Sequence, residues 1–167
     1  MKGQAEIIIF LLLFIIGVLL FASATVWSRG IFQENVDFTM LESAERFMKD
    51  LDSRISDVIK FGGMQEIDYG IGGTIEIDYP QAIEVRVPLT MQLQNDWVNI
   101  SEGDSYIMEK KDGTDLVLRL VYPGTNDYDI VFTTNGSSLA QPDYIRIEKN
   151  STNFDTASVI EIKITFV

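Results

Sequence analysis

The sequence contains neither cysteine nor histidine. Without cysteine the chain forms no disulfide and offers no thiolate nucleophile. Without histidine it has no imidazole for acid–base catalysis, and the usual zinc ligands are missing as well. These two absences exclude Ser-His and Cys-His catalysis. They do not assign a redox compartment, because a chain without cysteine suits either one.

Charge is also missing from one long stretch, since no Asp, Glu, Lys or Arg occurs between Ile7 and Ser28. The formal net charge of −12 therefore belongs almost wholly to the residues from Arg29 onward. Such an acidic body repels the phosphates of nucleic acids, which excludes nucleic acid as a partner.

The uncharged run predicts a helix that is apolar on every face. At 1.5 Å per residue, Ile7–Ser28 spans about 33 Å, close to the hydrocarbon thickness of a bilayer. A helix of this kind needs lipid or other apolar helices around it. It fits a transmembrane anchor, a secretory signal cleaved behind Ala22-Ser23-Ala24 to leave a start at Thr25, or a helix that is retained and used for assembly.

The residues ahead of the run favour the last of these. Lys2-Gly3-Gln4-Ala5-Glu6, followed by Ile7–Leu11, resembles the class III signal peptide of archaeal type IV pilins and archaellins. In that family a prepilin peptidase cuts between a glycine and a glutamine, here Gly3 and Gln4, and the helix is retained. The resemblance implies a leader at residues 1–3. It also implies that Glu6 sets the register of subunits by pairing with a neighbour's new N-terminus.

A second helical segment is expected after the apolar run. Residues 35–61 contain no proline or glycine, and Gly62-Gly63 is a stop signal. Apolar residues recur there with a 3-4-3-4-3 spacing, which predicts one apolar stripe: Leu41, Ala44, Met48, Leu51, Ile55 and Val58. We therefore expect a long N-terminal helix over 4–61, with 7–28 in a membrane or filament core and 35–61 amphipathic. The sequence leaves open whether Gly30 breaks it.

From residue 64 to 167 the period of the pattern changes to two, which predicts strands. We expect them at 75–78, 83–87, 116–122, 128–132, 144–148 and 159–166, with turns at Pro80, Asp112-Gly113 and Pro123-Gly124. Gly70–Gly73 reads as a turn, because neither a helix nor a lysine follows to make a phosphate loop. The predicted fold class is α+β: a long hydrophobic helix followed by an antiparallel β-sandwich head.

Other candidate sites are weaker, and no catalytic constellation or cofactor motif is present. Acidic turns offer oxygen ligands for Ca²⁺ but match no EF-hand loop, so no metal site is predicted. They are Glu102-Gly103-Asp104, Asp112-Gly113-Thr114-Asp115 and Asn126-Asp127-Tyr128-Asp129. Five aromatic residues either form a sugar-binding surface or pack in the core: Trp97, Tyr106, Tyr128, Tyr144 and Phe154.

Three N-glycosylation sequons begin at Asn99, Asn135 and Asn150, each in or near an expected turn. Together with an export signal they predict a glycosylated outer surface. Archaeal pilins, which the N-terminus resembles, are commonly N-glycosylated.

The sequence thus predicts a non-enzymatic structural subunit of an archaeal type IV pilus-like filament at the cell surface, serving adhesion or motility. Its expected partners are further copies of itself, the membrane before assembly, and the prepilin peptidase with the pilus assembly machinery. One alternative is a single-pass anchored β-sandwich binding module, associated with an S-layer or a filament motor. The other is a soluble secreted protein beginning at Thr25.

Overall fold

The structure is a computed structural model that describes residues 2–78, 81–101, 105–123, 128–134, 142–153 and 159–167. At residues 2–5 and 151–153 it describes the backbone alone. The chain divides into two compact units, Met1–Asp37 and Phe38–Val167. The second unit is the head, and it contains helical residues as well as all the strands.

A single helix, α1, runs from Lys2 to Phe61. It passes Gly30 without interruption, which a helix tolerates at moderate cost. The helix ends as the sequence predicts. Gly62 takes a left-handed conformation with a φ of 71°, and its N–H donates to the carbonyl oxygen of Val58 over 2.9 Å. Glycine is favoured at this position because it has no Cβ to clash.

The second half of α1 packs its predicted stripe into the head. Ala44, Met48, Leu51, Ile55 and Val58 are all completely buried, while Leu41 is half-buried. The ring of Phe47, beside the stripe, meets the ring of Tyr69 edge-on at a centroid distance of 5.3 Å. The expectation of an amphipathic helix over 35–61 is therefore confirmed for the part that lies in the head.

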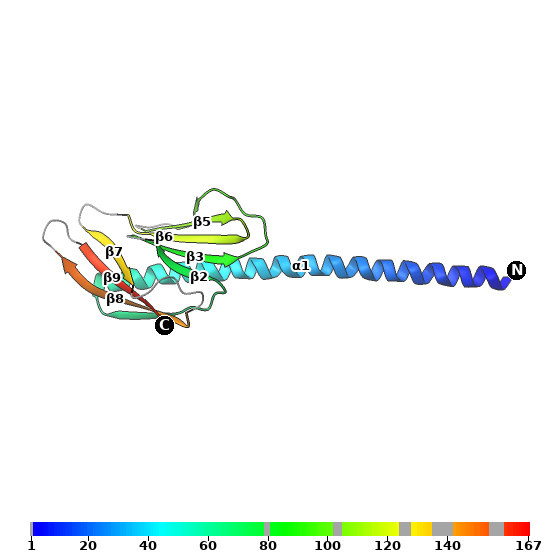
Figure 1. The fold of residues 1–167 in the computed structure, drawn as a ribbon, viewed down its shortest axis with the longest axis horizontal. Coiled ribbons are helices and arrows are strands. Elements are labelled where there is room, and N and C mark those ends of the chain that lie inside the picture. The colour runs from blue at the N-terminus through cyan, green and yellow to red at the C-terminus, as the bar shows by residue number, and fades with distance from the viewer. Residues whose placement is uncertain (1, 79–80, 102–104, 124–127, 135–141, 154–158) are drawn as a thin grey trace. The chain divides into compact units, whose positions relative to one another are not determined.

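Within the described residues, nine strands form two sheets (Figure 1). The four-stranded sheet has the order β1-β8-β9-β7, made of Met64–Asp68, Tyr144–Asn153, Val159–Phe166 and Asp129–Thr134. The five-stranded sheet has the order β2-β3-β6-β5-β4, made of Thr74–Asp78, Ala82–Pro88, Asp115–Val121, Tyr106–Asp112 and Val98–Asn99.

Almost all neighbouring strands are antiparallel, and the exception is β7, which runs parallel to β9. The C-terminal strand β9 therefore lies inside its sheet, between β8 and β7. Val167 continues this arrangement, since its N–H donates to the carbonyl oxygen of Tyr144 over 3.0 Å. The predicted α+β class, a long apolar helix followed by predominantly antiparallel sheets, is confirmed.

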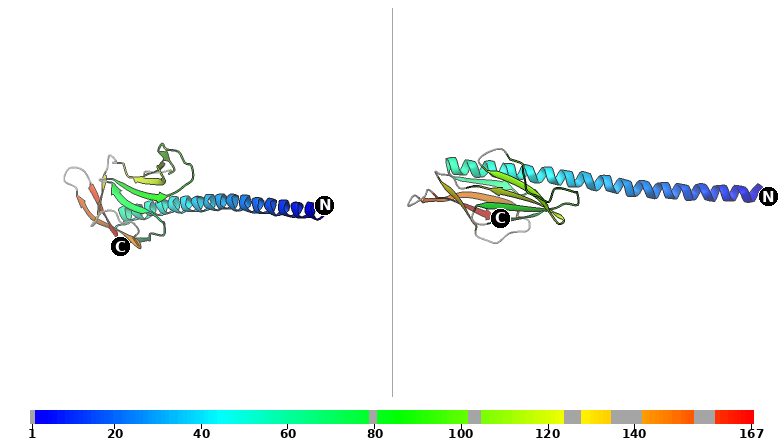
Figure 2. Two further views of the ribbon diagram at one scale, coloured as in Figure 1. Left: turned by 45° about the vertical axis from the view of Figure 1, so that its right-hand side comes forward. Right: turned by 90° about the horizontal axis from the view of Figure 1, so that it is seen from above.

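Both sheets and the helical stripe share one hydrophobic core. The alternating apolar residues of the strands point into it, including Ile83, Val85, Leu118, Phe132, Ile145, Ile147, Ile162 and Ile164. Seen from above, the strands lie on one side of the head's portion of α1 (Figure 2, right). The same alternation leaves the polar residues of β2, β3 and β6 on the opposite face of the five-stranded sheet.

All six predicted strands are present, but the expectation that they complete the set is wrong, because β1, β4 and β5 were not predicted. The reason is clearest in β5, where Ile107 is buried while Glu109 and Lys111, on the same side, are charged. That side carries no apolar alternation. In β1 the alternation is short, and β4 has two residues.

The predicted turns have mixed outcomes. Asp112 and Asp115 are register partners, so Gly113-Thr114 closes the β5–β6 hairpin as expected. Gly113 has a φ of 65°, and a positive φ at the first loop residue alone is the pattern of a type II′ turn. Gly70–Gly73 lies between β1 and β2 as an irregular connection, as predicted. Pro80 and Gly124 lie outside the described residues.

Candidate functional site

The apolar run on α1 exposes its large side chains. Its large apolar side chains from Ile7 to Trp27 are 43% to 76% exposed. The helix is long and apolar enough to cross a membrane, by length and composition. In water such a surface carries a large free-energy cost, so it requires lipid or other apolar helices around it.

Two hydroxyl groups within the run form hydrogen bonds to the backbone of the helix itself. Ser23 Oγ donates to the carbonyl oxygen of Leu19 over 2.9 Å, and Thr25 Oγ1 donates to that of Phe21 over 2.8 Å. Hydroxyls that bond back to the preceding turn are compatible with an apolar medium. The last third of the run therefore remains suited to lipid or to a helix bundle.

Apolar exposure continues beyond the first charged residue after the run. Arg29 is followed by Ile31, 41% exposed, and Phe32, 69% exposed. The other side of this segment is polar: Gln33 Nε2 donates to Asp37 Oδ1 over 2.9 Å, and Asp37 is only 2% exposed. The segment after the run thus has an apolar surface of its own.

The predicted processing residues lie at the start of the same helix. Gly3 and Gln4 both have a helical backbone. Glu6 is exposed. Cleavage between Gly3 and Gln4, and the register role of Glu6, remain predictions.

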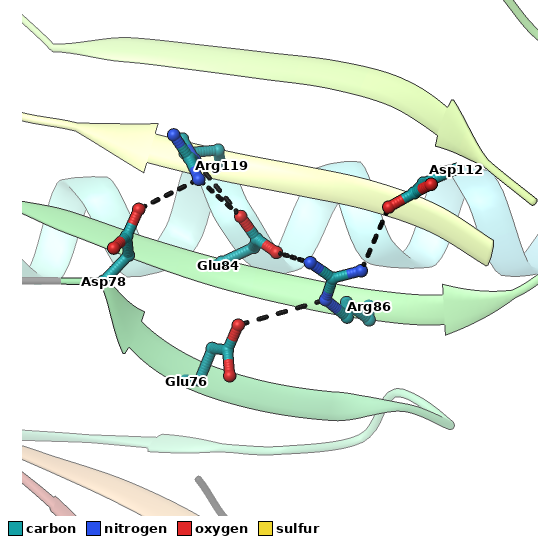
Figure 3. Close-up of polar contacts among 6 residues, drawn as sticks. All are labelled: Glu76, Asp78, Glu84, Arg86, Asp112 and Arg119. Carbon is teal, nitrogen blue, oxygen red and sulfur yellow. Dashed lines mark hydrogen bonds and ion pairs between the residues drawn. The ribbon is translucent and has the colours of Figure 1, made fainter. Parts of the chain in front are cut away.

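The outer face of the five-stranded sheet carries a linked set of charges (Figure 3). At its centre is Glu84, whose side chain is 3% exposed and which bonds two arginines. Arg119 Nη2 donates to Glu84 Oε2 over 2.8 Å, and Arg86 donates to the other oxygen. Both oxygens of this buried carboxylate are therefore engaged.

Three more carboxylates surround the arginines (Figure 3). Asp78 lies 2.9 Å from Arg119, Asp112 lies 3.3 Å from Arg86, and Glu76 lies 3.9 Å from Arg86. Desolvation lowers the pKa of Arg86, but attraction to Glu84 and hydrogen bonds to Asp112 and Glu84 outweigh it, so its pKa is raised. Because every group is engaged with a neighbour, the network holds β2, β3, β5 and β6 together.

Two of the five predicted aromatic residues lie at this face. Trp97 is 37% exposed and Tyr106 is 45% exposed. The indole of Trp97 contacts two cations, Lys110 at 4.7 Å and Arg119 at 5.1 Å from the ring centroid. Tyr128 and Tyr144 are half-buried and belong to the other sheet's strands or their flanks, and Phe154 lies outside the described residues. The predicted aromatic set therefore does not form one surface.

The sequons have different settings. Asn99 ends β4 and is exposed, and its Oδ1 accepts from Ser101 N–H over 3.1 Å. Asn150 is exposed at an irregularity in the β8–β9 register, between Lys149 and Ser151. Asn135 lies outside the described residues. Asn150 therefore lies within β8 and not in a turn, since the strand continues to Asn153, while both described sequon asparagines are exposed.

The acidic turns do not assemble a metal site among the residues that the structure describes. Within that part of the chain, no three His, Cys, Asp or Glu residues are grouped to hold an ion. Asp112 bonds Arg86 instead. Glu102, Asp104, Asn126 and Asp127 lie outside the described residues.

Sequence reasoning missed Glu109, which faces α1. It lines a hollow of about 330 Å³ together with Gln92, Leu93, Gln94, Val98, Lys110 and Leu116. Its Oε2 is buried and has no hydrogen-bond partner among the described residues. Burial raises the pKa of Glu109, nearby Glu45 raises it further, and Lys49 opposes both. This carboxyl destabilises the head when it is ionised.

Compared with protein-family models, with curated proteins and with solved structures, the chain matches none.

Proposed function

We propose that this chain is a structural subunit of an archaeal type IV pilus-like filament at the cell surface. It polymerises through its N-terminal helix and serves adhesion or motility. The helix rests in the membrane before assembly, and the prepilin peptidase removes residues 1–3. In the filament, apolar helices of neighbouring copies replace the lipid.

The observation that carries the proposal is the apolar surface beyond the length of a bilayer. Ile7–Ser28 already matches the hydrocarbon thickness, at about 33 Å. Ile31 and Phe32 lie past that span and past Arg29, yet they are 41% and 69% exposed. If the hydrocarbon layer covers Ile7–Ser28, lipid tails end before these two side chains, whereas a parallel copy of the same helix carries matching apolar side chains.

The charges near the helix support the same interpretation. Glu6 and Arg29 bound the apolar run at its two ends and have opposite signs. If copies pack parallel and without stagger, each glutamate faces another glutamate, which is unfavourable in an apolar core. A staggered arrangement avoids this repulsion and lets Glu6 meet a positive group, such as a neighbour's N-terminal amine. Staggered parallel helices build an open helical polymer.

The head supplies the outer surface of such a filament. Its exposed acidic groups and its tightly linked sheet face suit a solvated coat, because like charges keep neighbouring filaments apart. The anchored binding module remains the second candidate function. The same exposed helix fits it, but it gives Ile31 and Phe32 no apolar partner.

The N-terminal residue of protein recovered from native cell-surface material tests the proposal. Trypsin cuts after Lys2, so a peptide that begins at Gln4 cannot arise from the digestion and marks prepilin processing. We expect Gln4. An intact Met1 or Lys2 would favour the anchored module, and a start at Thr25 would overturn the filament proposal.

A further inference from the structure

Trp97 and Asn99 lie on one face of the five-stranded sheet. The register pairs Val98 with Glu109 and Asn99 with Met108, which places Trp97 opposite Lys110. The contact between Lys110 Nζ and the Trp97 ring, at 4.7 Å, agrees with this placement. Residues two apart in a strand share a face and lie about 6.6 Å apart. A sugar ring attached to Asn99 therefore reaches the indole.

The indole is held in place before any ligand arrives. It contacts Lys110 and, at 5.1 Å, Arg119. Arg119 is fixed in turn by Glu84 and Asp78, over 2.8 and 2.9 Å. Trp97 nevertheless keeps 37% of its surface exposed. An ordered and partly open aromatic ring binds with little further loss of side-chain entropy.

The amide of Asn99 is oriented by its own sequon. Its Oδ1 accepts from Ser101 N–H over 3.1 Å and lies 3.2 Å from Ser101 Oγ, so the sequon forms an Asx-turn. Ser101 Oγ also accepts from Ile107 N–H over 2.8 Å. The amide oxygen is thus engaged with Ser101, and the Asn99 residue remains exposed.

We propose that Asn99 carries an N-linked saccharide whose first sugar stacks on Trp97. The inference rests on the proposed function, because it requires the head to face the outside of the cell. The nearby indole distinguishes the Asn99 sequon from the other two. The residue two positions earlier is Glu148 for Asn150 and Thr133 for Asn135, so neither has an aromatic ring at that place.

The modification is a group transfer from a lipid-linked saccharide phosphate. Nδ2 of Asn99 forms a bond to the anomeric carbon of the saccharide, and the bond from that carbon to the phosphate oxygen breaks. The lipid phosphate leaves with the electron pair, and Nδ2 loses one proton. The transfer precedes complete folding, because the folded head engages the Ser101 hydroxyl. The stacked sugar then covers the part of the Trp97 side chain that is exposed to water.

The first test is the mass of one tryptic peptide from native cells. Cleavage after Arg86 and Lys110 releases Val87–Lys110, which contains Asn99 and neither of the other sequons. We expect a saccharide on this peptide, retained in Ser101→Thr and lost in Asn99→Gln. A peptide that is unmodified in every copy overturns the inference. If the same protein begins at Gln4, the filament proposal still stands and only the glycosylation inference fails.

The second test concerns Trp97 itself. In a Trp27→Phe background Trp97 is the remaining tryptophan, and we expect glycosylation to change its fluorescence. We also expect the glycosylated head to melt about 3 °C above the Asn99→Gln variant, a difference that disappears when Trp97→Ala is present in both. Trp97→Tyr keeps an aromatic ring for stacking, so this variant should retain most of the difference in melting temperature. If glycosylation raises the melting temperature equally in wild type and in Trp97→Ala, the sugar does not stack on Trp97.

Discussion

The Tyr122 hydroxyl, at the end of β6, donates a hydrogen bond to the carboxylate of Asp52 on α1. Tyr122 also packs its ring against Phe132 of the other sheet, at a centroid distance of 5.7 Å. Burial and the hydrogen bond to Asp52 both raise the pKa of Tyr122, so it remains a neutral donor. One side chain thus connects the helix with both sheets of the head.

Tyr122→Phe is expected to destabilise the head by about 1–2 kcal/mol, since a buried hydrogen bond to a charged group is lost while the ring packing stays. Chemical unfolding of the full chain in detergent, followed by near-UV circular dichroism, measures the change. Tyr106→Phe removes a hydroxyl from an exposed ring and serves as the control, with an expected effect below about 0.5 kcal/mol. Equal effects of the two variants would contradict the role of the Asp52 bond.

Glu84→Ala is expected to cost about 2–3 kcal/mol in the same unfolding measurement. It removes a buried carboxylate and leaves Arg86 and Arg119 with weaker, more exposed partners. The matched variant Glu76→Ala deletes an exposed carboxylate 3.9 Å from Arg86 and should cost less than about 1 kcal/mol. If Glu76 proved the costlier of the two, Glu84 would not be the centre of the network.

Glu109→Gln is expected to stabilise the head at neutral pH. The folded state raises the pKa of Glu109 by burial, so it binds the proton up to a higher pH than the unfolded chain does. Stability therefore falls as pH rises from the ordinary value of 4.5 through the raised pKa, and the variant removes that fall.

The check on Glu109 is a pair of unfolding curves. The variant should exceed wild type at pH 7 and match it near pH 4, within the range where the head stays folded. Asp57→Asn on the exposed side of α1 controls for the change in net charge. A gain that is the same at both pH values would show that ionisation of Glu109 is not its cause.

Phe32→Ser is expected to abolish or strongly reduce filaments while leaving membrane insertion intact, because Phe32 lies past the bilayer span. Sheared cell-surface material examined by electron microscopy reports on assembly, and membrane fractionation reports on insertion. Phe61→Ser is the matched control, since Phe61 is also an exposed phenylalanine of α1 at 83%. Normal filaments from Phe32→Ser would remove the main support for polymerisation.

Glu6→Gln tests the expected register role. The variant should be processed and inserted like wild type, yet assemble at least tenfold less, since a neutral amide attracts a neighbour's N-terminal amine weakly. Arg29→Gln alters the charge at the other end of the run and controls for a general effect of charge removal. Full assembly of Glu6→Gln would show that Glu6 does not set the register.

The elements that follow an apolar period could be predicted from the sequence. The stripe from Leu41 to Val58 and the strands around Val85, Leu118 and Ile162 each bury one regular face, which alternation reveals without knowledge of partners. β5 was not predicted because the charged residues Glu109 and Lys111 lie on its inward side and interrupt the apolar alternation. Lys111 is accommodated by donating to the carbonyl oxygens of Leu89 and Met91, a solution that exists only in the folded head.

The charged network and the Trp97 platform could not be predicted for a related reason. Alternation in β3 shows that Glu84 and Arg86 share an outer face, but the partner Arg119 is 35 residues away. Its position opposite Glu84 depends on the order and register of β3 and β6. Likewise, the closeness of Trp97 to Lys110 and Arg119 is a property of strand pairing. The local sequence pattern identifies which residues share a face of a strand, while the pairing of strands determines which charged residues come into contact.

The interior position of β9 constrains the order of events as the protein is made. β9 lies between β8 and β7, which therefore cannot join one sheet until β9 is in place. Three residues of β9 also contribute to the hydrophobic core: Ile160, Ile162 and Ile164. The four-stranded sheet therefore forms only after the chain has been synthesised through β9, and the parallel pairing of β7 with β9 adds a long-range step that slows folding. If α1 inserts as proposed, it reaches the membrane while the head is still unfolded, because it precedes the strands in the chain. In that case, a ribosome that stalls before β9 leaves a membrane-inserted chain without a finished core, which is the kind of substrate that membrane proteases remove.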